Sequence, residues 1–307
     1  MSRVYDLVMT HKLDADDFFI HRVQQHCAEA GWSFFLIEPL WAQAFYDSFR
    51  RGEVWARVLL NMHSEHHDPN DLYHRLVRLA AERHTKVIDP PAVALAAFNK
   101  AALHHRLIAA GIHVPYTLIV RREQVPEYRF VNGEFELLGT PFVIKPSLGY
   151  GRKGVVLKAT SEADLVRSAL AWPSDAYLLQ RLIVPRDLRG EPAYWRVFYV
   201  FGSIWICWWN CHTDRYRSLA AGDLTVEESA RLEDIARRIA STTGMKFFST
   251  EVAQVESGGL IVIDYVNDQC HLLSQQSNPR LGVPDELVAA VAKRLVEGAK
   301  ELVSSAP

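Results

Sequence analysis

The chain has 307 residues, of which 49% are hydrophobic and 23% are charged, and this balance excludes a disordered or fibrous protein. A chain of this length and composition can bury the cores of two or three compact units. The formal net charge is −2 at pH 7, and no run of Lys or Arg is longer than a pair, so no strong field attracts nucleic acid or an acidic membrane. We therefore expect small molecules or other proteins as partners.

Cysteine usage and hydropathy predict a soluble cytoplasmic protein. The spacing of the four cysteines fits neither a zinc site nor a dense disulfide framework, so reduced thiols are expected at Cys27, Cys207, Cys211 and Cys270. The first residues, Met1 to Asp17, carry acids and lack the apolar core of a signal peptide. No run of about 18 apolar residues is present that could span a bilayer.

The first 90 residues alternate between strand and helix patterns, which predicts a small, mainly parallel sheet with flanking helices. The expected strands are Val4–Met9, Ser33–Ile37, Ala56–Met62 and Lys86–Ile88, and the expected helices are Asp17–Ala30 and Pro69–Arg83. Ligands of such sheets bind beyond the carboxyl ends of the strands. The loops that carry Lys12 and His63 follow two of these strands, so they are candidate substrate contacts, although structural packing is an equal explanation for the histidine.

A break at Asp89-Pro90-Pro91 predicts the first domain boundary. A single helix is expected over Ala92–Ala110, followed by a strand at Tyr116–Val120. Asn132-Gly133 between alternating apolar residues predicts a β-hairpin. Next, Pro141–Lys145 is an apolar strand that runs into a glycine-containing loop.

The last third begins with a well-marked helix. Thr225 and Glu228 form a capping-box pattern, apolar residues recur at helical spacing, and Gly244 ends the element. Two strands, Phe248–Glu256 and Leu260–Val266, then flank Gly258-Gly259, and a closing helix begins at Pro284.

The glycine loop over residues 149–154 is the first candidate site. Gly149, Gly151 and Gly154 let backbone N–H groups approach phosphate oxygens, and Lys145 offers a positive charge at the end of the preceding strand. The loop lacks the Gly-Lys-Ser/Thr ending of a Walker loop and opens a strand, unlike a Rossmann fingerprint. An ordinary hairpin loop is the alternative.

Two acids near the C-terminus form the second candidate site. If Gly258 and Gly259 are the central residues of a two-residue turn, Ala253 lies opposite Asp264, and Glu251 then points to the same face as Asp264. Two neighbouring carboxylates repel each other unless a cation lies between them, and Mg²⁺ prefers oxygen ligands that it shares with phosphates. Two solvated acids on a hairpin are the alternative.

Two arginines, Arg196 and Arg215, are candidates for binding a phosphoryl or carboxylate group, with ordinary surface arginines as the alternative. The tryptophans between them, Trp205, Trp208 and Trp209, are expected to be packing residues. A metal site at His63/Glu65/His66/His67 is disfavoured because adjacent side chains in an extended loop diverge.

Taken together, these motifs resemble the ATP-grasp superfamily, in particular ribosomal-protein glutamate ligases, D-alanine:D-alanine ligase and glutathione synthetase. The resemblance is one of order and spacing from Phe98 to Leu272 and includes the stretch Gly111–Thr117, which looks like the family's "GI-x-VP-x-T" segment. It implies an ATP-grasp fold of α/β and α+β parts with an N-terminal Rossmann-like pre-ATP-grasp domain. The implied domains are residues 1–90 and 91–307, the second consisting of a first lobe (91–179) and a second lobe (180–307).

The resemblance also implies site residues. The ATP-binding set would be Lys100, Lys145, Ser147, Gly149, Gly151, Gly154, Gln180, Arg181, Ile183 and Asp187. The hinge that begins at Gln180 would read adenine through its backbone, and Asp187 would bind the ribose. Magnesium would be held by Glu251, Asp264 and Asn267, and Arg196 and Arg215 would stabilise the transferring group.

The chain departs from the family pattern at three places. The usual magnesium motif is Glu-x-Asn, whereas Asp264 and Asn267 are separated by two residues, so a β-bulge would be needed to bring Asn267 to the metal. Tyr194 replaces the usual Asp two residues before Arg196, and Arg181 replaces a frequent hinge acid.

The implied activity is Mg-ATP-dependent activation of a small carboxylate as an acylphosphate, which an amine then attacks. Two alternatives stay open: a small-molecule kinase of the inositol polyphosphate kinase type, and a nucleotide-binding module without turnover. The tryptophan-rich strand and the small N-terminal unit are compatible with a homodimer.

Overall fold

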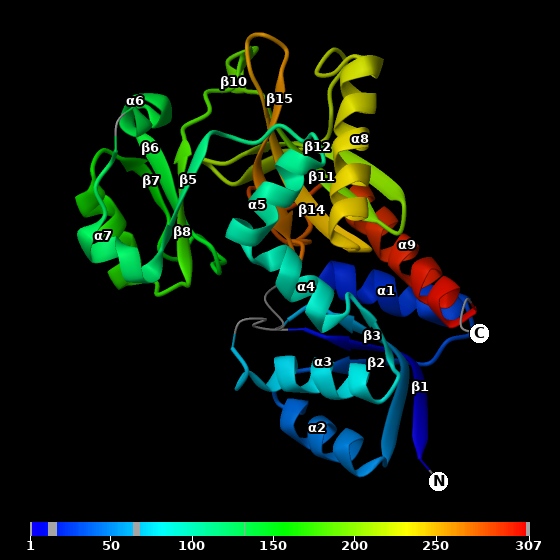
Figure 1. The fold of residues 1–307 in the computed structure, drawn as a ribbon. Helices are drawn as coiled ribbons and strands as arrows, with labels where there is room; N and C mark the ends of the chain where they lie inside the picture. The colour runs from blue at the N-terminus through cyan, green and yellow to red at the C-terminus, as the bar shows by residue number, and fades with distance from the viewer. Residues whose placement is uncertain (1, 12–16, 64–67, 132, 305–307) are drawn as a thin grey trace. The chain divides into compact units, whose positions relative to one another are not determined.

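A computed structural model of the chain describes residues 2–11, 17–63, 68–131 and 133–304 (Figure 1). These residues pack as two compact units. The first contains Met1–Leu95, Arg196–Ser249 and Asn267–Pro307, and the second contains Ala96–Trp195 and Thr250–Val266. The boundary expected between residues 90 and 91 lies close to Leu95, where the chain first leaves the first unit. The division into residues 1–90 and 91–307 stays a prediction.

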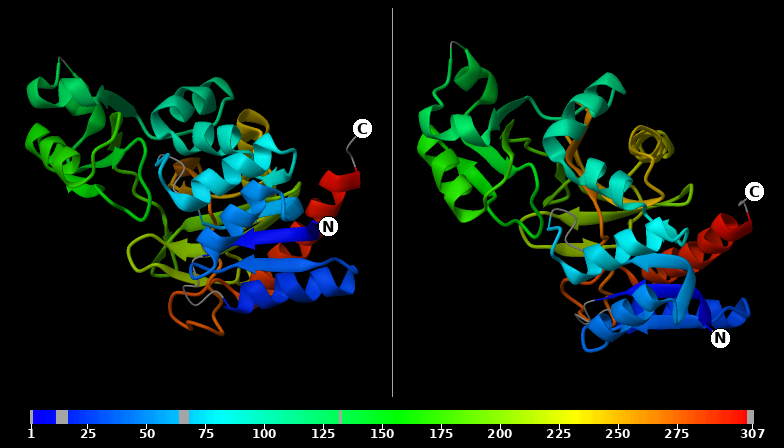
Figure 2. Two further views of the ribbon diagram at one scale, coloured as in Figure 1. Left: turned by 90° about the horizontal axis from the view of Figure 1, so that it is seen from below. Right: turned by 60° about the horizontal axis from the view of Figure 1, so that its bottom comes forward.

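The first unit begins with a four-stranded sheet of order β2-β1-β3-β4, built from β1 (Arg3–Thr10), β2 (Phe34–Ile37), β3 (Val54–Asn61) and β4 (Lys86–Ile88). All its pairings are parallel, which confirms the expected parallel sheet. Its helices are α1 (Asp17–Glu29), α2 (Ala42–Arg51) and α3 (Leu72–Glu82), joined by the C-terminal α9 (Asp285–Ser304). Helices α1 and α9 lie side by side (Figure 1, Figure 2).

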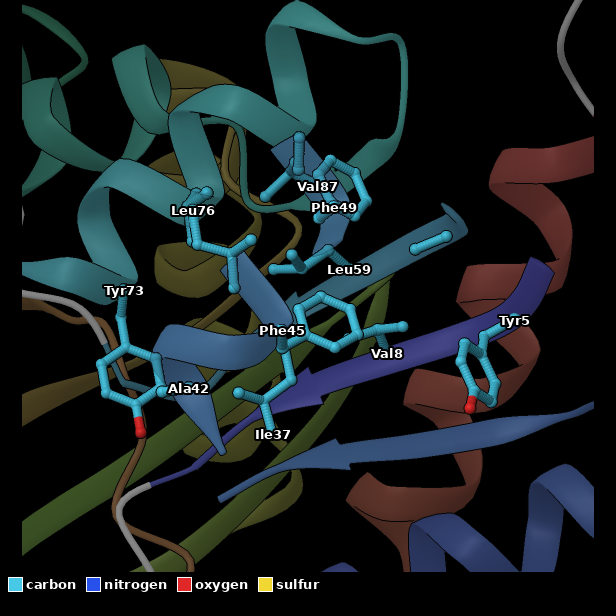
Figure 3. Packing of buried hydrophobic residues seen from close by; sticks show 13 residues of the cluster. Tyr5, Val8, Ile37, Ala42, Phe45, Phe49, Leu59, Tyr73, Leu76 and Val87 are labelled. Atoms are coloured by element: carbon cyan, nitrogen blue, oxygen red, sulfur yellow. The ribbon is translucent and has the colours of Figure 1, made fainter. Parts of the chain in front are cut away.

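Helices α2 and α3 bury their apolar faces against the parallel sheet. Figure 3 shows Phe45 and Phe49 of α2 and Leu76 of α3 packed over Val8 and Leu59 of the strands. Helix α2 had no cap signal in the sequence, because Trp41 stands at its N-cap and makes no side-chain cap hydrogen bond. Burial of these aromatic side chains removes apolar surface from water and fixes the layer.

The second unit contains an antiparallel sheet of order β5-β8-β6-β7. Its strands are β5 (Thr117–Arg121), β8 (Ala176–Arg181), β6 (Phe142–Pro146) and β7 (Val156–Ala159), with helices α6 (Glu134–Leu138) and α7 (Glu162–Ala171). The central strand β8 pairs with both β5 and β6, and Lys145 is registered with Leu178. The described residues also form a five-stranded sheet of order β13-β12-β11-β14-β15.

The strands of this five-stranded sheet are β11 (Tyr194–Val200), β12 (Ser203–Asn210), β13 (Arg215–Arg217), β14 (Phe247–Gln254) and β15 (Leu260–Asn267). Helix α8 (Val226–Thr243) precedes β14. Its predicted ends are confirmed: Thr225 and Glu228 form the capping box, and Gly244 is the C-cap with φ of 80°.

Two local predictions were wrong. The helix expected over Ala92–Ala110 is two helices, α4 (Pro91–Phe98) and α5 (Lys100–Ala109), because the Asn99 side chain accepts the backbone N–H of Ala102 and starts a new helix. The hairpin expected at Asn132-Gly133 is not formed. Gly133 is instead the N-cap of α6 with φ of 79°, and Asn132 lies outside the described residues. A positive φ at glycine serves a helix start as well as a hairpin turn.

Candidate functional site

Lys145 reaches the acid-bearing hairpin of the second unit. Its ammonium donates a hydrogen bond of 2.6 Å to the backbone carbonyl of Ile263 on β15. Ile263 directly precedes Asp264. The side chain of Lys145 therefore ends beside the strand that carries one of the two candidate metal ligands.

Lys100 is positioned by a hydrogen-bonded cap at the start of α5. The buried hydroxyl of Ser147 donates to Asn99 Oδ1 at 2.8 Å and accepts from Ala101 N at 3.1 Å. Lys100 N donates to the carbonyl of Ser147 at 3.1 Å. These bonds attach the first turn of α5, which carries Lys100, to Ser147 at the end of β6, the strand that carries Lys145. The Ser147 hydroxyl is used in this cap.

The ammonium of Lys100 is influenced by three other charged candidates of this unit. It donates to the carbonyl of Gly149 at 2.9 Å. Burial lowers the pKa of Lys100, the charge of Asp264 opposes this shift, Lys145 adds to it, and Glu251 opposes it. The charges of two acids and a second lysine therefore act on the Lys100 ammonium.

The glycine loop is anchored at both ends. Trp172 Nε1 donates to the carbonyl of Leu148 at 2.8 Å, and Ser168 Oγ donates to the carbonyl of Gly154 at 2.6 Å. Between these anchors, Gly151 has φ of 57°. Lys153 donates to the Tyr150 hydroxyl at 2.6 Å. Both ends of the loop are thus tied to α7 and its C-cap residue Trp172, and residues 151–153 in its middle are exposed.

Gln180 is a buried residue of β8 whose side chain links two other strands by hydrogen bonds. Its side-chain amide donates to Thr117 Oγ1 at 3.1 Å and to the Tyr265 hydroxyl at 2.8 Å. The Gln180 amide nitrogen is thus engaged within the protein, and recognition of adenine by the hinge backbone stays a prediction. Arg181 is exposed and donates to the carbonyl of Leu137 at 2.8 Å.

The two remaining hinge candidates lie on the chain just after β8. Ile183 is half-buried. Asp187 is exposed at the start of β9 (Asp187–Leu188). Its carboxylate accepts the backbone N–H of Gly190, in the turn that leads to β10 (Glu191–Pro192), at 2.9 Å. Their contact with a nucleotide stays a prediction.

The expected register of the acidic hairpin was wrong. Val255 N donates to the carbonyl of Gly259 at 2.9 Å, and Gly258 N donates to the carbonyl of Val255 at 2.8 Å. The turn therefore contains three residues, because only Gly258, with φ of 77°, takes the left-handed conformation. This turn places Thr250 rather than Ala253 beside Asp264, and the Thr250 hydroxyl donates to the carbonyl of Asp264 at 2.9 Å.

Both acids nevertheless remain close enough to Lys100 to shift its pKa. Glu251 and Asp264 are half-buried, and their carboxylate oxygens are the ligand type that magnesium takes. Among the residues that the structure describes, no three His, Cys, Asp or Glu side chains gather as a metal site. Of the disfavoured cluster His63/Glu65/His66/His67, residues 64–67 lie outside the described residues.

Asn267 and Arg196 belong to the first unit and both contact Ser249. Asn267 Nδ2 lies 3.4 Å from the carbonyl of Ser249, and Arg196 Nε donates to its hydroxyl at 3.0 Å. Arg196 is buried and lies over the ring of Trp209. Arg215 is exposed on β13, opposite Asn210.

The carboxyl ends of β1 and β3 meet, as expected for a parallel sheet. Thr10 Oγ1 donates to Asn61 Oδ1 at 3.0 Å and accepts from Met62 N at 3.0 Å. The ring of His63 packs edge-on to Tyr73 with centroids 4.8 Å apart. The second substrate candidate, Lys12, lies outside the described residues.

Sequence reasoning missed Tyr265 and His104. Tyr265 is two residues before Asn267, where the family motif has its glutamate, and His104 is one helical turn after Lys100. The imidazole Nδ1 of His104 lies 2.6 Å from the Tyr265 hydroxyl, and both side chains are buried. The spacing to Asn267 was a usable signal for Tyr265, whereas nothing in the sequence pairs it with His104.

Comparison with solved structures shows the ATP-grasp fold over nearly the whole chain. A RimK domain ATP-grasp protein from Sphaerobacter thermophilus DSM 20745 matches with a TM-score of 0.64 and 19% identity, covering 96% of this chain and 98% of that one. D-alanine–D-alanine ligase from Bacillus anthracis complexed with ATP matches with a TM-score of 0.67 and 12% identity over 100% of both chains. The ATP-grasp ligase PsnB, complexed with a minimal precursor, Mg and ADP, matches with a TM-score of 0.58 and 13% identity, covering 97% and 98%.

No sequence-family model matches the chain, and no curated protein sequence matches it. The likeness is therefore one of fold, which confirms the fold class expected from the motifs. Within the described part of the chain, none of the helices combines the length and the apolar character needed to cross a membrane.

Proposed function

We propose that this chain, which has the ATP-grasp fold, is a Mg-ATP-dependent ligase that joins a small carboxylate to an amine. One arrangement carries the proposal: the ammonium of Lys100 bonds the glycine loop at Gly149, and that of Lys145 bonds Ile263 beside Asp264. The charges of Asp264 and Glu251 act on Lys100 in the same region. Two cations, two acids and exposed loop backbone are what a metal-bound triphosphate requires. The bound ATP in the Bacillus anthracis ligase and the Mg and ADP in PsnB support the same class of ligand.

In the proposed reaction, an oxygen of the carboxylate attacks the γ-phosphorus of ATP and ADP leaves. The amine then attacks the acyl carbon of the acylphosphate, inorganic phosphate leaves, and the amine gives up a proton. Lys100 and Lys145 would neutralise phosphate charge, and the backbone of residues 149–154 would bind phosphate oxygens. Positioning and electrostatics dominate phosphoryl transfer, so no protein nucleophile is required.

The acids would hold magnesium. Glu251 and Asp264 supply carboxylate oxygens, Asn267 would add an amide oxygen, and phosphate oxygens or water would complete the shell. Bound Mg²⁺ would offset charge on the phosphates. In the same proposal Arg196 and Arg215 stabilise the transferring group, while Lys12 and His63 contact the carboxylate substrate.

The test is an assay of the purified protein with Mg-ATP and pools of amino acids, small carboxylates and polyols, in which ADP and free phosphate are both measured. Release of phosphate equal to ADP that depends on both a carboxylate and an amine supports the ligase. ADP formation with phosphate retained on a polyol would replace it with a kinase. Protection by ATP against thermal unfolding without ADP formation in any pool would leave a nucleotide-binding module.

The cytoplasmic location and a homodimer also stay predictions. A sedimentation measurement on the full chain would decide the oligomeric state.

A further inference from the structure

The second unit contains a buried chain of hydrogen bonds that runs through the hydroxyl of Tyr265. Gln180 Nε2 donates to that oxygen at 2.8 Å, and His104 Nδ1 lies 2.6 Å from it. Gln180 Nε2 also donates to Thr117 Oγ1, and Thr117 donates to the carbonyl of Pro115 at 2.8 Å. We refer to Tyr265, His104, Gln180 and Thr117 as the tyrosine network.

Burial keeps the imidazole of the tyrosine network uncharged. Burial lowers the pKa of His104 to about 4, with a smaller contribution from His105, so the imidazole is neutral at pH 7. Gln180 donates to the phenol oxygen, and the phenol also shares a hydrogen bond with His104 Nδ1, in which the donor depends on the imidazole tautomer.

The network joins the three elements that carry the candidate ATP site. His104 lies one turn after Lys100 on α5, which places both on the same face of the helix. Tyr265 directly follows Asp264 on β15, and Gln180 begins the hinge at the end of β8. Through one phenol oxygen, the helix of the first lysine, the strand of the acid and the hinge are therefore held to one another.

We propose that Tyr265 is a positioning residue for nucleotide binding, which sets the spacing between Lys100, Asp264 and the hinge through its bonds to His104 and Gln180. The inference rests on the proposed function, because it assigns this role at the proposed ATP site. It departs from the family pattern, in which this position two residues before the asparagine holds a metal-binding glutamate. Here the side chain is directed into the protein interior.

The geometry indicates that Tyr265 positions other residues and does not itself contact the nucleotide. Tyr265 is 2% exposed, and its hydroxyl is occupied by Gln180 and His104, so it has no free donor for a ligand. A buried polar network restrains its members because breaking one bond leaves the remaining buried groups unsatisfied. The cost of removing the phenol therefore falls on the placement of Lys100 and Asp264.

The experiment measures the affinity of the full chain for a non-hydrolysable ATP analogue with Mg²⁺, and the steady-state constants for ATP. Tyr265→Phe keeps the ring and removes only the bonds, so we expect affinity to fall by about tenfold and KM for ATP to rise with a smaller change in kcat. Partial unfolding alone would lower the apparent kcat and leave KM unchanged. The matched control is Tyr128→Phe. In the wild-type chain the Tyr128 hydroxyl donates to Glu134 on α6 at 3.3 Å, and Glu134 is not one of the proposed ATP-site residues.

A second variant tests the network from the helix. His104→Leu removes this hydrogen-bond partner of Tyr265, so it should weaken analogue binding by a similar factor. The double variant should lose little more than either single one, because both break the same bond. This variant also serves if Tyr265→Phe does not fold. Additive losses, or binding by Tyr265→Phe within about twofold of wild type, would overturn the inference while the ATP site stands. No binding of the analogue by the wild-type chain would instead overturn the proposed function.

Discussion

The ammonium of Lys145 donates a 2.6 Å hydrogen bond to the carbonyl of Ile263, a residue 118 positions later in the chain. The bond connects the strand before the glycine loop to the strand that carries Asp264. An ammonium has three donors, so this contact leaves donors of Lys145 for a phosphate oxygen at the same place. A lysine held in this way is pre-oriented, which reduces the entropy lost when a ligand binds.

Replacement of Lys145 by Ala should remove most of the stabilisation that ATP gives to the protein. A charged hydrogen bond to phosphate is worth about tenfold to a hundredfold in affinity, and a hundredfold loss removes up to about 2.7 kcal/mol of ligand stabilisation. The measurement is the shift in Tm on addition of Mg-ATP, taken within each variant so that loss of the bond to Ile263 cancels. The control is Lys158→Ala, which removes an exposed lysine on β7 and should keep the wild-type shift. An equal shift in wild type and Lys145→Ala would remove Lys145 from the site.

Gly154 should be the glycine of the loop that tolerates substitution least. A Cβ there would lie 2.5 Å from Trp172 Cβ and 2.9 Å from Pro146 Cγ, and its φ is +71°. Gly154→Ala should therefore lower the free energy of unfolding by about 2 to 5 kcal/mol, the sum of overpacking and left-handed strain.

Gly151→Ala supplies the matched control for this prediction. Gly151 has a similar φ of +57°, but a Cβ would meet nothing within 4 Å, so only about 1 to 2 kcal/mol of backbone strain is expected. Urea unfolding of both variants measures the difference. If the two variants lose equal stability, the close packing of Gly154 on Trp172 does not exist in solution.

Local signals in the sequence predicted the elements whose ends are marked by capping residues. Helix α8 begins and ends where Thr225, Glu228 and Gly244 indicate, because these residues satisfy the backbone groups that every helix end leaves unpaired. Asn99 has the same capping chemistry, yet the apolar pattern on both sides of it favoured one continuous helix. Its role became visible only through its contact with Ser147, which comes from a distant strand.

The sequence suggested the residues of the candidate site but gave the wrong register for its hairpin. Lys145, Glu251 and Asp264 were chosen from their sequence patterns and Lys100 from the family resemblance, and in the structure the charges of the other three residues act on Lys100. Their role in binding stays a prediction. The turn between the two acids depends on which glycine takes a positive φ, and two adjacent glycines leave that choice open. The tyrosine network could not be predicted, since its bonds join residues up to 161 positions apart.

Removal of the charge of Asp264 should shift the pH dependence of nucleotide binding. Burial lowers the pKa of Lys100 and Asp264 opposes that shift, so Asp264→Asn lowers the pKa of Lys100 further. Because the binding form of Lys100 is the protonated one, affinity for ATP should decline at a lower pH in Asp264→Asn than in wild type. Calorimetric titrations between about pH 7 and about pH 9 measure this decline.

The control for this titration is Glu136→Gln, which removes an exposed acid on α6. It should keep the wild-type pH profile even if its affinity changes slightly. Coincident profiles for wild type and Asp264→Asn would show that Asp264 exerts no field on Lys100.

Asp89 should make the first unit less stable as pH rises. Its carboxylate accepts backbone N–H groups of Lys246 and Phe247, each at 2.9 Å, yet burial, and to a smaller extent the charge of Asp268, raise its pKa from 3.8 to about 7. Between these two values the folded chain keeps a proton that the unfolded chain has released. The bound proton of Asp89 therefore adds roughly 4 kcal/mol to the free energy of unfolding below about pH 4, and this stabilisation is lost as pH rises through about 7.

The measurement compares the free energy of unfolding of wild type and Asp89→Asn by urea titration across this range. Asn does not titrate, so the difference between the two proteins should fall with rising pH, while the effects of all other acids cancel. Asp268→Asn removes one cause of the raised pKa, so it should move the decline toward lower pH. A difference that stays constant between about pH 4 and about pH 7 would mean that Asp89 is ionised throughout, with its two backbone donors outweighing the cost of burial.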